Sequence, residues 1–314
     1  MRDLLTLLVG VVFAATGGEL FVRGAVGVAA WARIPAGIIG STVAAFATSS
    51  PELAVAVTAA ADGRPELAMG DALGSNVVNL GLVLGMAVVV ARIRVERDVL
   101  RRDLPAVLAA TVAIAVLSID GALSRLDAVL LLAGFVGWLA VSVRDARRAR
   151  DATPEVFGAP RHPSALAATV AGLVALVIAG RLIVTAAKGI GAALELDPFL
   201  VGSTLVAFGT STPELATTII SRLRGHDEVG VGTVLGSNVF NALWIVGVAG
   251  LVHPIRLGAG AAGAGEVTVS VLAGVALALL VVPGRSGELG RGRGALLVAG
   301  YGLTVAALFA TGAI

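Results

Sequence analysis

The sequence predicts an all-α membrane protein with ten transmembrane helices, arranged as two inverted five-helix repeats whose helices break near the bilayer midplane. Three observations predict this fold: long apolar segments, an uneven placement of arginine and an internal repeat. Of 314 residues, 57% are hydrophobic and only 14% are charged, and the mean hydropathy is +0.95. Soluble domains carry about 25% charged residues, so the composition excludes an ordinary soluble fold.

Ten apolar segments of membrane-spanning length are separated by charge clusters and by Gly or Pro. Their approximate limits are 4–30, 35–61, 66–91, 102–119, 123–143, 164–194, 198–221, 229–252, 266–283 and 294–313. The first segment continues to about Val22 without a cleavage boundary, so it is predicted to be a helix and not a signal peptide. Cys is absent, which excludes disulfides and Cys-ligated metals.

Arginine indicates the orientation in the membrane. When alternate loops are assigned to two sides, sixteen arginines fall on one side and four on the other, namely Arg2, Arg64, Arg125 and Arg256. Cytoplasmic loops carry the excess of Lys and Arg. We therefore expect both termini to lie outside and the polar segment 146–163 to be a cytoplasmic linker.

An internal repeat divides the chain. Residues 40–85 align without a gap with residues 202–247, at an offset of 162 and with 21 identities in 46 positions. Five spans separate the two copies. Because each span reverses the direction of the chain through the membrane, an odd number of spans gives the copies opposite orientations. The prediction is a single membrane domain with repeats at 1–145 and 164–314. Inverted repeats of this kind are typical of secondary transporters, whose substrate sites lie near the midplane.

Each repeat carries one acidic residue at membrane depth. Glu52 and Glu214 are equivalent positions, and each is the only charged residue of its span between the flanking arginines. A charge there costs several kcal/mol unless it is paired, protonated or ligated, so it marks a functional site by default. The alternative is a structural hydrogen bond between helices.

A proline precedes each of these acids. Pro51 and Pro213 lack an N–H and free the carbonyl one turn earlier, so each helix should break there. Ser50 and Thr212 would then be N-caps of new helices. Irregular backbone at membrane depth is tolerated where it lines a cavity, although a simple proline kink is the alternative interpretation.

A second motif, GSNVVN at 74–79 and GSNVFN at 236–241, adds neutral oxygens. Ser75 and Asn79 are four residues apart and share a helix face, and the second copy repeats this spacing. Packing between helices is the alternative role, above all for Ser75 and Asn76. Two carboxylates with many neutral oxygens suit Ca²⁺. All three histidines fall in loops, so a transition metal is not expected.

Three further polar residues leave alternatives open. Glu19 and Arg181 are equivalent positions of opposite charge, so they could pair with each other or extend to an interface. Asp71 stands where the second copy has Thr233. It could guard an ion path or be an exposed acid at a helix end.

The motifs GSTVAAFATSSPEL with GSNVVN, and GSTLVAFGTSTPEL with GSNVFN, resemble the paired alpha-repeats of the cation/calcium exchanger superfamily, in its sodium/calcium exchanger branch of prokaryotic type. The resemblance implies an antiporter of the inner (plasma) membrane that exchanges calcium for sodium by alternating access. It implies these ion ligands: carboxylates of Glu52 and Glu214, backbone oxygens of Thr48 and Thr210, hydroxyls of Ser49, Ser211, Ser75 and Ser237, carbonyls near Ala45 and Ala207, and side chains of Asn79 and Asn241.

The chain departs from this family at Asn241, where many relatives have Asp, which puts the coupling ratio in doubt. Proton-coupled relatives usually carry a GNxxE-type motif where this chain has TSSPE and TSTPE, which favours sodium over protons. A calcium/proton antiporter, an exchanger of another cation and a passive channel remain alternatives. An intramembrane hydrolase using Ser49 or Ser211 is disfavoured because its helices contain no His or Lys base. We expect no enzyme activity and no cofactor. The expected partners are calcium, sodium and the lipid bilayer, without nucleic acid or an obligate protein partner.

Overall fold

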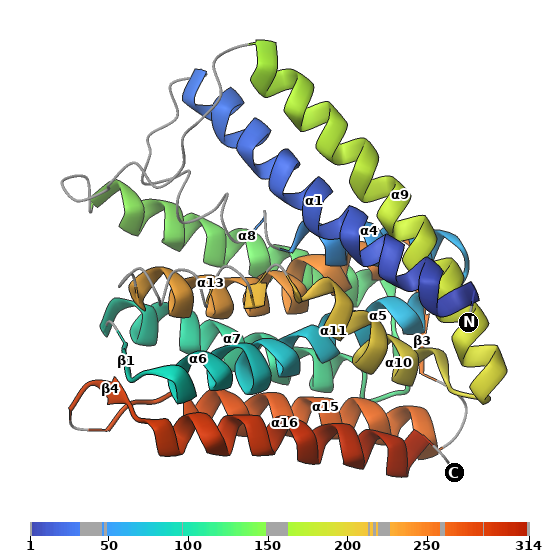
Figure 1. Ribbon diagram of the computed structural model, residues 1–314. Helices are drawn as coiled ribbons and strands as arrows, with labels where there is room; N and C mark the ends of the chain where they lie inside the picture. The colour runs from blue at the N-terminus through green and yellow to red at the C-terminus, as the bar shows by residue number, and fades with distance from the viewer. Residues whose placement is uncertain are drawn as a thin grey trace.

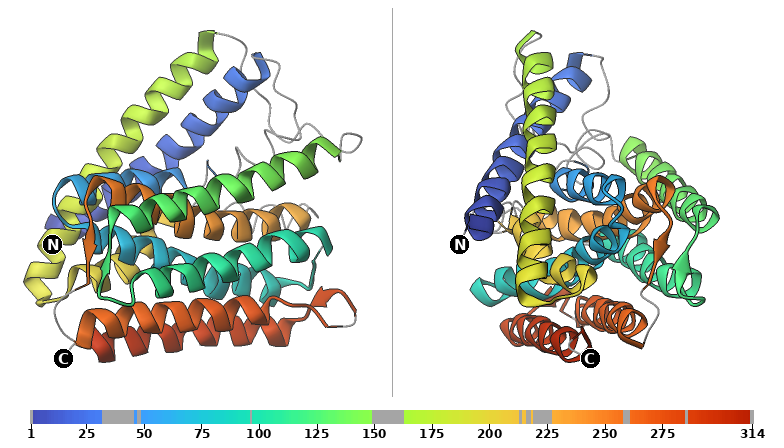
Figure 2. Two further views of the ribbon diagram at one scale, coloured as in Figure 1. Left: turned by 180° about the vertical axis from the view of Figure 1, so that it is seen from behind. Right: turned by 90° about the vertical axis from the view of Figure 1, so that its right-hand side faces the viewer.

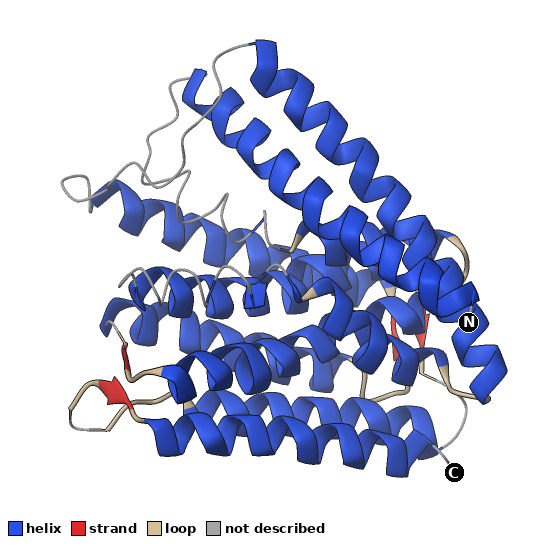
Figure 3. Ribbon diagram, in the orientation of Figure 1, coloured by secondary structure: helices blue, strands red, loops and turns tan. Residues whose placement is uncertain are grey.

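The computed structural model describes residues 2–31, 46, 49–95, 97–148, 163–212, 214–215, 218, 227–257, 261–284 and 286–312. The first half contains α1 (Arg2–Trp31), α4 (Ser50–Ala61), α5 (Pro65–Val77), the π-helix η2 (Val78–Leu84), α6 (Gly85–Val90), α7 (Arg97–Leu117) and α8 (Arg125–Arg148). The second half contains α9 (Pro163–Leu194), α10 (Pro198–Val201), the π-helix η3 (Gly202–Val206), α11 (Ala207–Thr210), α13 (Asp227–Val239), the π-helix η4 (Phe240–Ile245), α14 (Val246–Val252), α15 (Ala261–Leu280) and α16 (Arg291–Gly312). Each of the ten predicted spans contains helix in the described residues, and Figure 3 shows that little else is regular.

The helices sort into central and outer ones by burial. Within the described residues, six helical segments are long and apolar enough to cross a membrane by length and composition. The segments 65–90 and 231–252 are about four-fifths buried, whereas the four containing α1, α8, α9 and α16 are buried over a third or less of their apolar windows. Apolar side chains on those outer helices face outward, as lipid contact requires. The two central spans carry the GSNxxN motifs.

The elements repeat with the same offset as the sequence. A shift of 162 residues carries α5 onto α13 and carries β1 (Ile93–Arg94) onto β3 (Ile255–Arg256). The strand β1 pairs with β4 (Glu288–Leu289), and β3 pairs with β2 (Ala122–Leu123), both antiparallel. Figure 1 shows β1 and β4 at one end of the molecule and β3 at the other, near both termini. Equivalent strands at opposite ends confirm that the two repeats are inverted.

The helices α1 and α9 pack along each other and cross the remaining helices at an angle, which the views in Figures 1 and 2 agree on. Small residues allow this close approach. A Cβ at Gly24 would lie 2.3 Å from the backbone nitrogen of Thr169, so only glycine fits there. The first helices of the two repeats, α1 and α9, therefore form a pair of their own beside the helices that carry the repeat motifs.

Glu19 and Arg181 do not pair with each other, so the first of the two alternatives left open by the sequence is excluded. Glu19 bonds Arg23 within α1, while Arg181 Nη1 donates to Asp62 Oδ1 at 2.9 Å. Lys188 Nζ also donates to Asp62, at 2.6 Å, and this hydrogen bond holds the pKa of the Asp62 carboxyl below its ordinary value.

The reason is the antiparallel crossing of α1 and α9. Gly10 of α1 faces Ile183, and Gly17 faces Ala175. Arg181 therefore lies level with the residues around Gly10, and equivalent sequence positions end up at different heights.

Candidate cation site

The predicted helix breaks lie beside the two acidic residues. The helix α11 ends at Thr210, and Ser211 has φ −79° and ψ 5°. In the first repeat, Ser49 has φ −87° and ψ 8°, immediately before α4. A regular helix has ψ near −42°, so both helices depart from helical geometry here. The prediction of a break is confirmed at these serines.

The predicted N-caps are wrong. Ser49, not Ser50, precedes α4, Pro51 lies within its first two residues, and no side chain caps the helix. Thr212 Oγ1 instead donates to the carbonyl of Phe208 at 3.3 Å. Because its hydroxyl does not cap α4, Ser49 Oγ is buried without a hydrogen-bond partner in the described part of the chain.

The predicted ion ligands are buried. Those that the structure describes are at most 1% exposed: Glu52, Glu214, Thr210, Asn79, Asn241, Ser49, Ser211, Ser75, Ser237 and Ala207. Thr48 and Ala45 lie outside the described residues. Asn79 and Asn241 fall about halfway along the spans 65–90 and 231–252, as a site near the midplane requires.

Predicted ligands from opposite repeats meet at the break in the second repeat. Ser75 Oγ of α5 lies 3.5 Å from Thr210 Oγ1 at the end of α11. The hydroxyls of Thr210 and Ser211 lie next to the Glu52 carboxylate, but neither makes a well-formed hydrogen bond with it. The carboxylate of one repeat therefore faces the broken helix of the other. Glu214 is equally buried, and Thr48, the counterpart of Thr210, lies outside the described residues.

Asp71 is a buried acid whose importance the sequence understated. It is 0% exposed in the middle of α5, so the interpretation as an exposed acid at a helix end is wrong. Its Oδ1 accepts from Thr210 Oγ1 at 3.0 Å and lies 3.5 Å from Ser75 Oγ. Glu52 lies close enough to interact with it electrostatically. The sequence did contain one signal for the importance of Asp71, because this carboxylate stands where the second repeat has the neutral Thr233.

The asparagines divide into two roles. Asn76 Nδ2 donates to the Asn238 carbonyl and Asn238 Nδ2 to the Asn76 carbonyl, each at 3.1 Å, so the packing role foreseen for Asn76 holds. Asn79 Nδ2 donates to Asn238 Oδ1 at 3.2 Å, which leaves Asn79 Oδ1 without a partner in the described residues. Both side-chain polar atoms of Asn241 lack one as well.

The wider helices η2 and η4, which the sequence did not predict, contain Asn79 and Asn241 respectively. Short π-helical segments are frequent at functional sites. Each begins two residues after the Asn of a GSN triplet, at Val78 and Phe240, so the GSNxxN motif and the widened turn overlap in both repeats.

The unpartnered buried atoms define the chemistry of the site. Several are oxygens without a hydrogen bond in the described residues: both Glu52 carboxylate oxygens, Asp71 Oδ2, Asn79 Oδ1, Asn241 Oδ1, Ser49 Oγ and Ser211 Oγ. Hard cations such as Ca²⁺ and Na⁺ take oxygen ligands. No cluster of three His, Cys, Asp or Glu side chains forms among the described residues, so neutral oxygens must supply most ligands.

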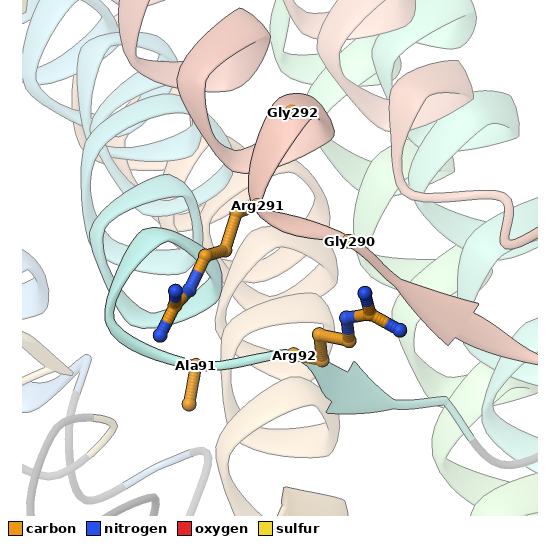
Figure 4. Close-up of a pocket in the computed structure, with 5 residues that line it drawn as sticks. All are labelled: Ala91, Arg92, Gly290, Arg291 and Gly292. Carbon is orange, nitrogen blue, oxygen red and sulfur yellow. The ribbon is translucent and has the colours of Figure 1, made fainter.

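A separate surface pocket of about 610 Å³ lies at the end of the molecule where β1 and β4 pair. Figure 4 shows that Ala91, Arg92 and Arg291 line it together with two glycines. The guanidinium of Arg291 donates to the carbonyl of Val90 at 3.2 Å. The described residues that line this pocket include two arginines and no carboxylate, whereas the buried acids lie in the central helices.

Two inverted repeats with buried oxygens at paired helix breaks define a multi-pass membrane transporter. The chain matches the family model described as sodium/calcium exchanger protein over residues 3–144 and 164–310, and it belongs to that family, within the cation/calcium exchanger superfamily. Membership confirms the resemblance drawn from the repeat motifs and supports cation antiport, since the family is one of ion exchangers.

Known proteins similar to this chain cover nearly all of it. The putative antiporter CaxA of Alkalimonas amylolytica is 35% identical over 292 residues, 91% of each protein. Inner membrane protein YrbG of Escherichia coli (strain K12) is 36% identical over 285 residues, 88% of this chain and 87% of that protein. A solved structure of the sodium-calcium exchanger NCX_Mj has a TM-score of 0.67 at 30% identity and covers 97% of this chain and 99% of its own.

Proposed function

We propose that the protein is a secondary active antiporter that exchanges calcium for sodium by alternating access at the buried oxygen cluster. One observation carries this proposal. Glu52 is 0% exposed, and both its carboxylate oxygens lack a hydrogen-bond partner in the described residues, although hydroxyls of the opposite repeat adjoin them. Leaving a buried charge uncompensated costs about 3–5 kcal/mol. A cation bound between the repeats would remove that cost.

The ligands in this proposal come from both repeats. Glu52 and Glu214 would share the divalent ion with the backbone oxygens of Thr48 and Thr210. Sodium would use the hydroxyls of Ser49, Ser211, Ser75 and Ser237 and carbonyls near Ala45 and Ala207. Asn79 and Asn241, whose side-chain oxygens lack partners in the described residues, would complete the centre.

Calcium and sodium suit this site better than other ions for two reasons. The ligands are oxygens of mixed charge, and Ca²⁺ accepts about six to eight such oxygens in flexible geometry. The solved exchanger NCX_Mj is described as soaked with Na⁺ together with Ca²⁺ or Sr²⁺. Calcium/proton exchange is the second candidate, because the buried carboxylates could also exchange protons.

The test is calcium uptake into proteoliposomes of the full chain. Vesicles are loaded with NaCl, KCl or choline chloride, diluted into labelled calcium, and compared with vesicles carrying a pH gradient alone. We expect uphill calcium uptake only with internal sodium. Uptake driven by the pH gradient without sodium would identify a proton antiporter. Calcium movement that never exceeds equilibrium would identify a channel.

We also propose an orientation in the plasma membrane. The end that carries β1 and β4 would face the cytoplasm together with the linker 146–163, and both termini would lie outside. The support is the excess of arginine on the loops of that end, which the positive-inside rule assigns to the cytoplasm.

A further inference from the structure

Glu266 is a buried acid that the proposed exchange does not use. It is the only charged residue of α15 and is 0% exposed. Both its carboxylate oxygens lack a hydrogen-bond partner in the described part of the chain. A buried charge without a compensating group is strongly destabilising. Glu266 therefore needs either a proton or a cation to balance it.

The equivalent helix of the first repeat, α7, shows a buried acid that has its own cation. Asp103 is 2% exposed, and Arg102 donates to its two carboxylate oxygens at 2.8 and 3.0 Å. Trp138 Nε1 donates to the same carboxylate at 3.2 Å. The helix α15 contains no Lys or Arg, and the repeat offset of 162 puts Leu104 in the place of Glu266. Glu266 is therefore not a second copy of a structural ion pair.

A second carboxylate, that of Asp197, lies beside Glu266. Asp197 is the N-cap of α10, where its Oδ1 accepts from the backbone nitrogen of Phe199 at 2.7 Å. The helix α15 packs against α10, and the two carboxyls lie close enough to interact electrostatically. Like charges in contact repel each other. Because Asp197 is exposed whereas Glu266 is buried, the pair has one oxygen group that water reaches and one that it does not.

Ser270 adds a neutral oxygen on the same face of α15. It follows Glu266 by four residues, which places both side chains on one side of the helix. Ser270 is 2% exposed, and its Oγ also lacks a partner among the described residues. Two carboxylates neutralise one divalent cation, and Ca²⁺ accepts carboxylates, neutral oxygens and water in flexible geometry. Water can complete the shell at Asp197.

We propose that Asp197 and Glu266, with Ser270, form a second calcium site at the end of the molecule that carries β3. Figure 1 shows α10 and β3 together at that end, near both termini. Thirteen residues of the helical run α10, η3 and α11 lead from Asp197 to Thr210, a distance of about 20 Å at about 1.5 Å per residue. The second site therefore shares no ligand with the proposed transport site.

The experiment counts bound calcium by equilibrium dialysis of the purified full-length protein against labelled calcium. The buffer is free of sodium and mildly alkaline, so that protons do not occupy the carboxylates. Weak calcium sites of extracellular modules bind at about 0.1–1 mM, so the titration extends about tenfold above this range. We expect the native protein to bind one more calcium ion per chain than Glu266→Gln, and the lost ion to be one that binds in this weak range.

A second variant and a control complete the test. Asp197→Asn removes the other charge, although Asn can still cap α10, and it should lose the same calcium ion. The control is Glu195→Gln, at an exposed acid two residues from Asp197, which should bind as many calcium ions as the native protein. Size-exclusion profiles establish that each variant is folded.

Two results would overturn the second site. If folded Glu266→Gln or folded Asp197→Asn binds as much calcium as the native protein, the two carboxyls share a proton instead of a cation. If Glu195→Gln loses the ion as well, calcium is held by the general negative charge of this surface. Neither result bears on the proposed exchange, because the transport site contributes equally to the native protein and to Glu266→Gln.

Discussion

Asn76 and Asn238, which the internal repeat makes equivalent, hydrogen-bond each other reciprocally, each amide nitrogen donating to the other's backbone carbonyl at 3.1 Å. Equal distances in both directions are what a local two-fold axis between the residues produces. Both side chains are nearly or fully buried. This contact therefore marks the place where the two inverted repeats meet.

The first prediction is that Asn238→Ala destabilises the protein more than Asn76→Ala. Asn76 contributes one amide donor to the contact, whereas Asn238 contributes a donor and also accepts from Asn79 Nδ2. Hydrogen bonds between membrane helices are worth about 0.6 kcal/mol each. The expected loss in the free energy of unfolding is therefore about 0.6 kcal/mol for Asn76→Ala and about 1.2 kcal/mol for Asn238→Ala. Unfolding in mixed detergent micelles measures both. Because both variants delete the same atoms, equal losses would contradict the bond to Asn79.

The second prediction concerns the acids of the proposed site. Glu52→Gln and Glu214→Gln should each abolish sodium-driven calcium uptake, because an amide keeps the shape of the side chain but removes the charge that balances calcium. The matched control is Glu66→Gln in the first turn of α5, at an acid that is partly exposed. It should transport normally. Near-native uptake by either site variant would refute a shared carboxylate site.

The third prediction uses two glycines in helices. A Cβ at Gly74 would lie 2.3 Å from the carbonyl oxygen of Ser203, whereas one at Gly137 in α8 meets nothing within 4 Å. Overpacking costs about 1–3 kcal/mol, so Gly74→Ala should lower the melting temperature and the transport rate. Gly137→Ala should leave both unchanged or raise the stability slightly. A tolerated Gly74→Ala would mean that α5 and η3 do not touch through their backbones.

The fourth prediction tests the orientation with cysteines placed in this cysteine-free chain. Asp120→Cys lies at the end of β2 and β3, and Ser286→Cys lies beside β4, and both positions are exposed. An impermeant maleimide should label position 120 in intact cells and position 286 only after permeabilisation. The reverse pattern would place the arginine-rich end outside.

The sequence by itself determined the membrane class, the ten helical spans, the inversion and most of the buried polar residues that are proposed as ligands. Each of these depends on local composition or on self-similarity. A stretch of about twenty apolar residues can satisfy its backbone in lipid only as a helix, and a proline within that helix removes one backbone hydrogen bond, which is why a break was expected at Pro51 and Pro213. For the same reason Glu52 and Glu214 could be singled out before any contact was known.

The tertiary structure alone decided which polar groups meet. The pairing of Arg181 with Asp62 instead of Glu19 depends on the relative height of α1 and α9, which backbone contacts at their small residues set. The burial of Asp71 depends on how closely α5 approaches the second repeat. Sequence periodicity describes one helix at a time, whereas the partner of a buried charge is chosen by the packing of several helices.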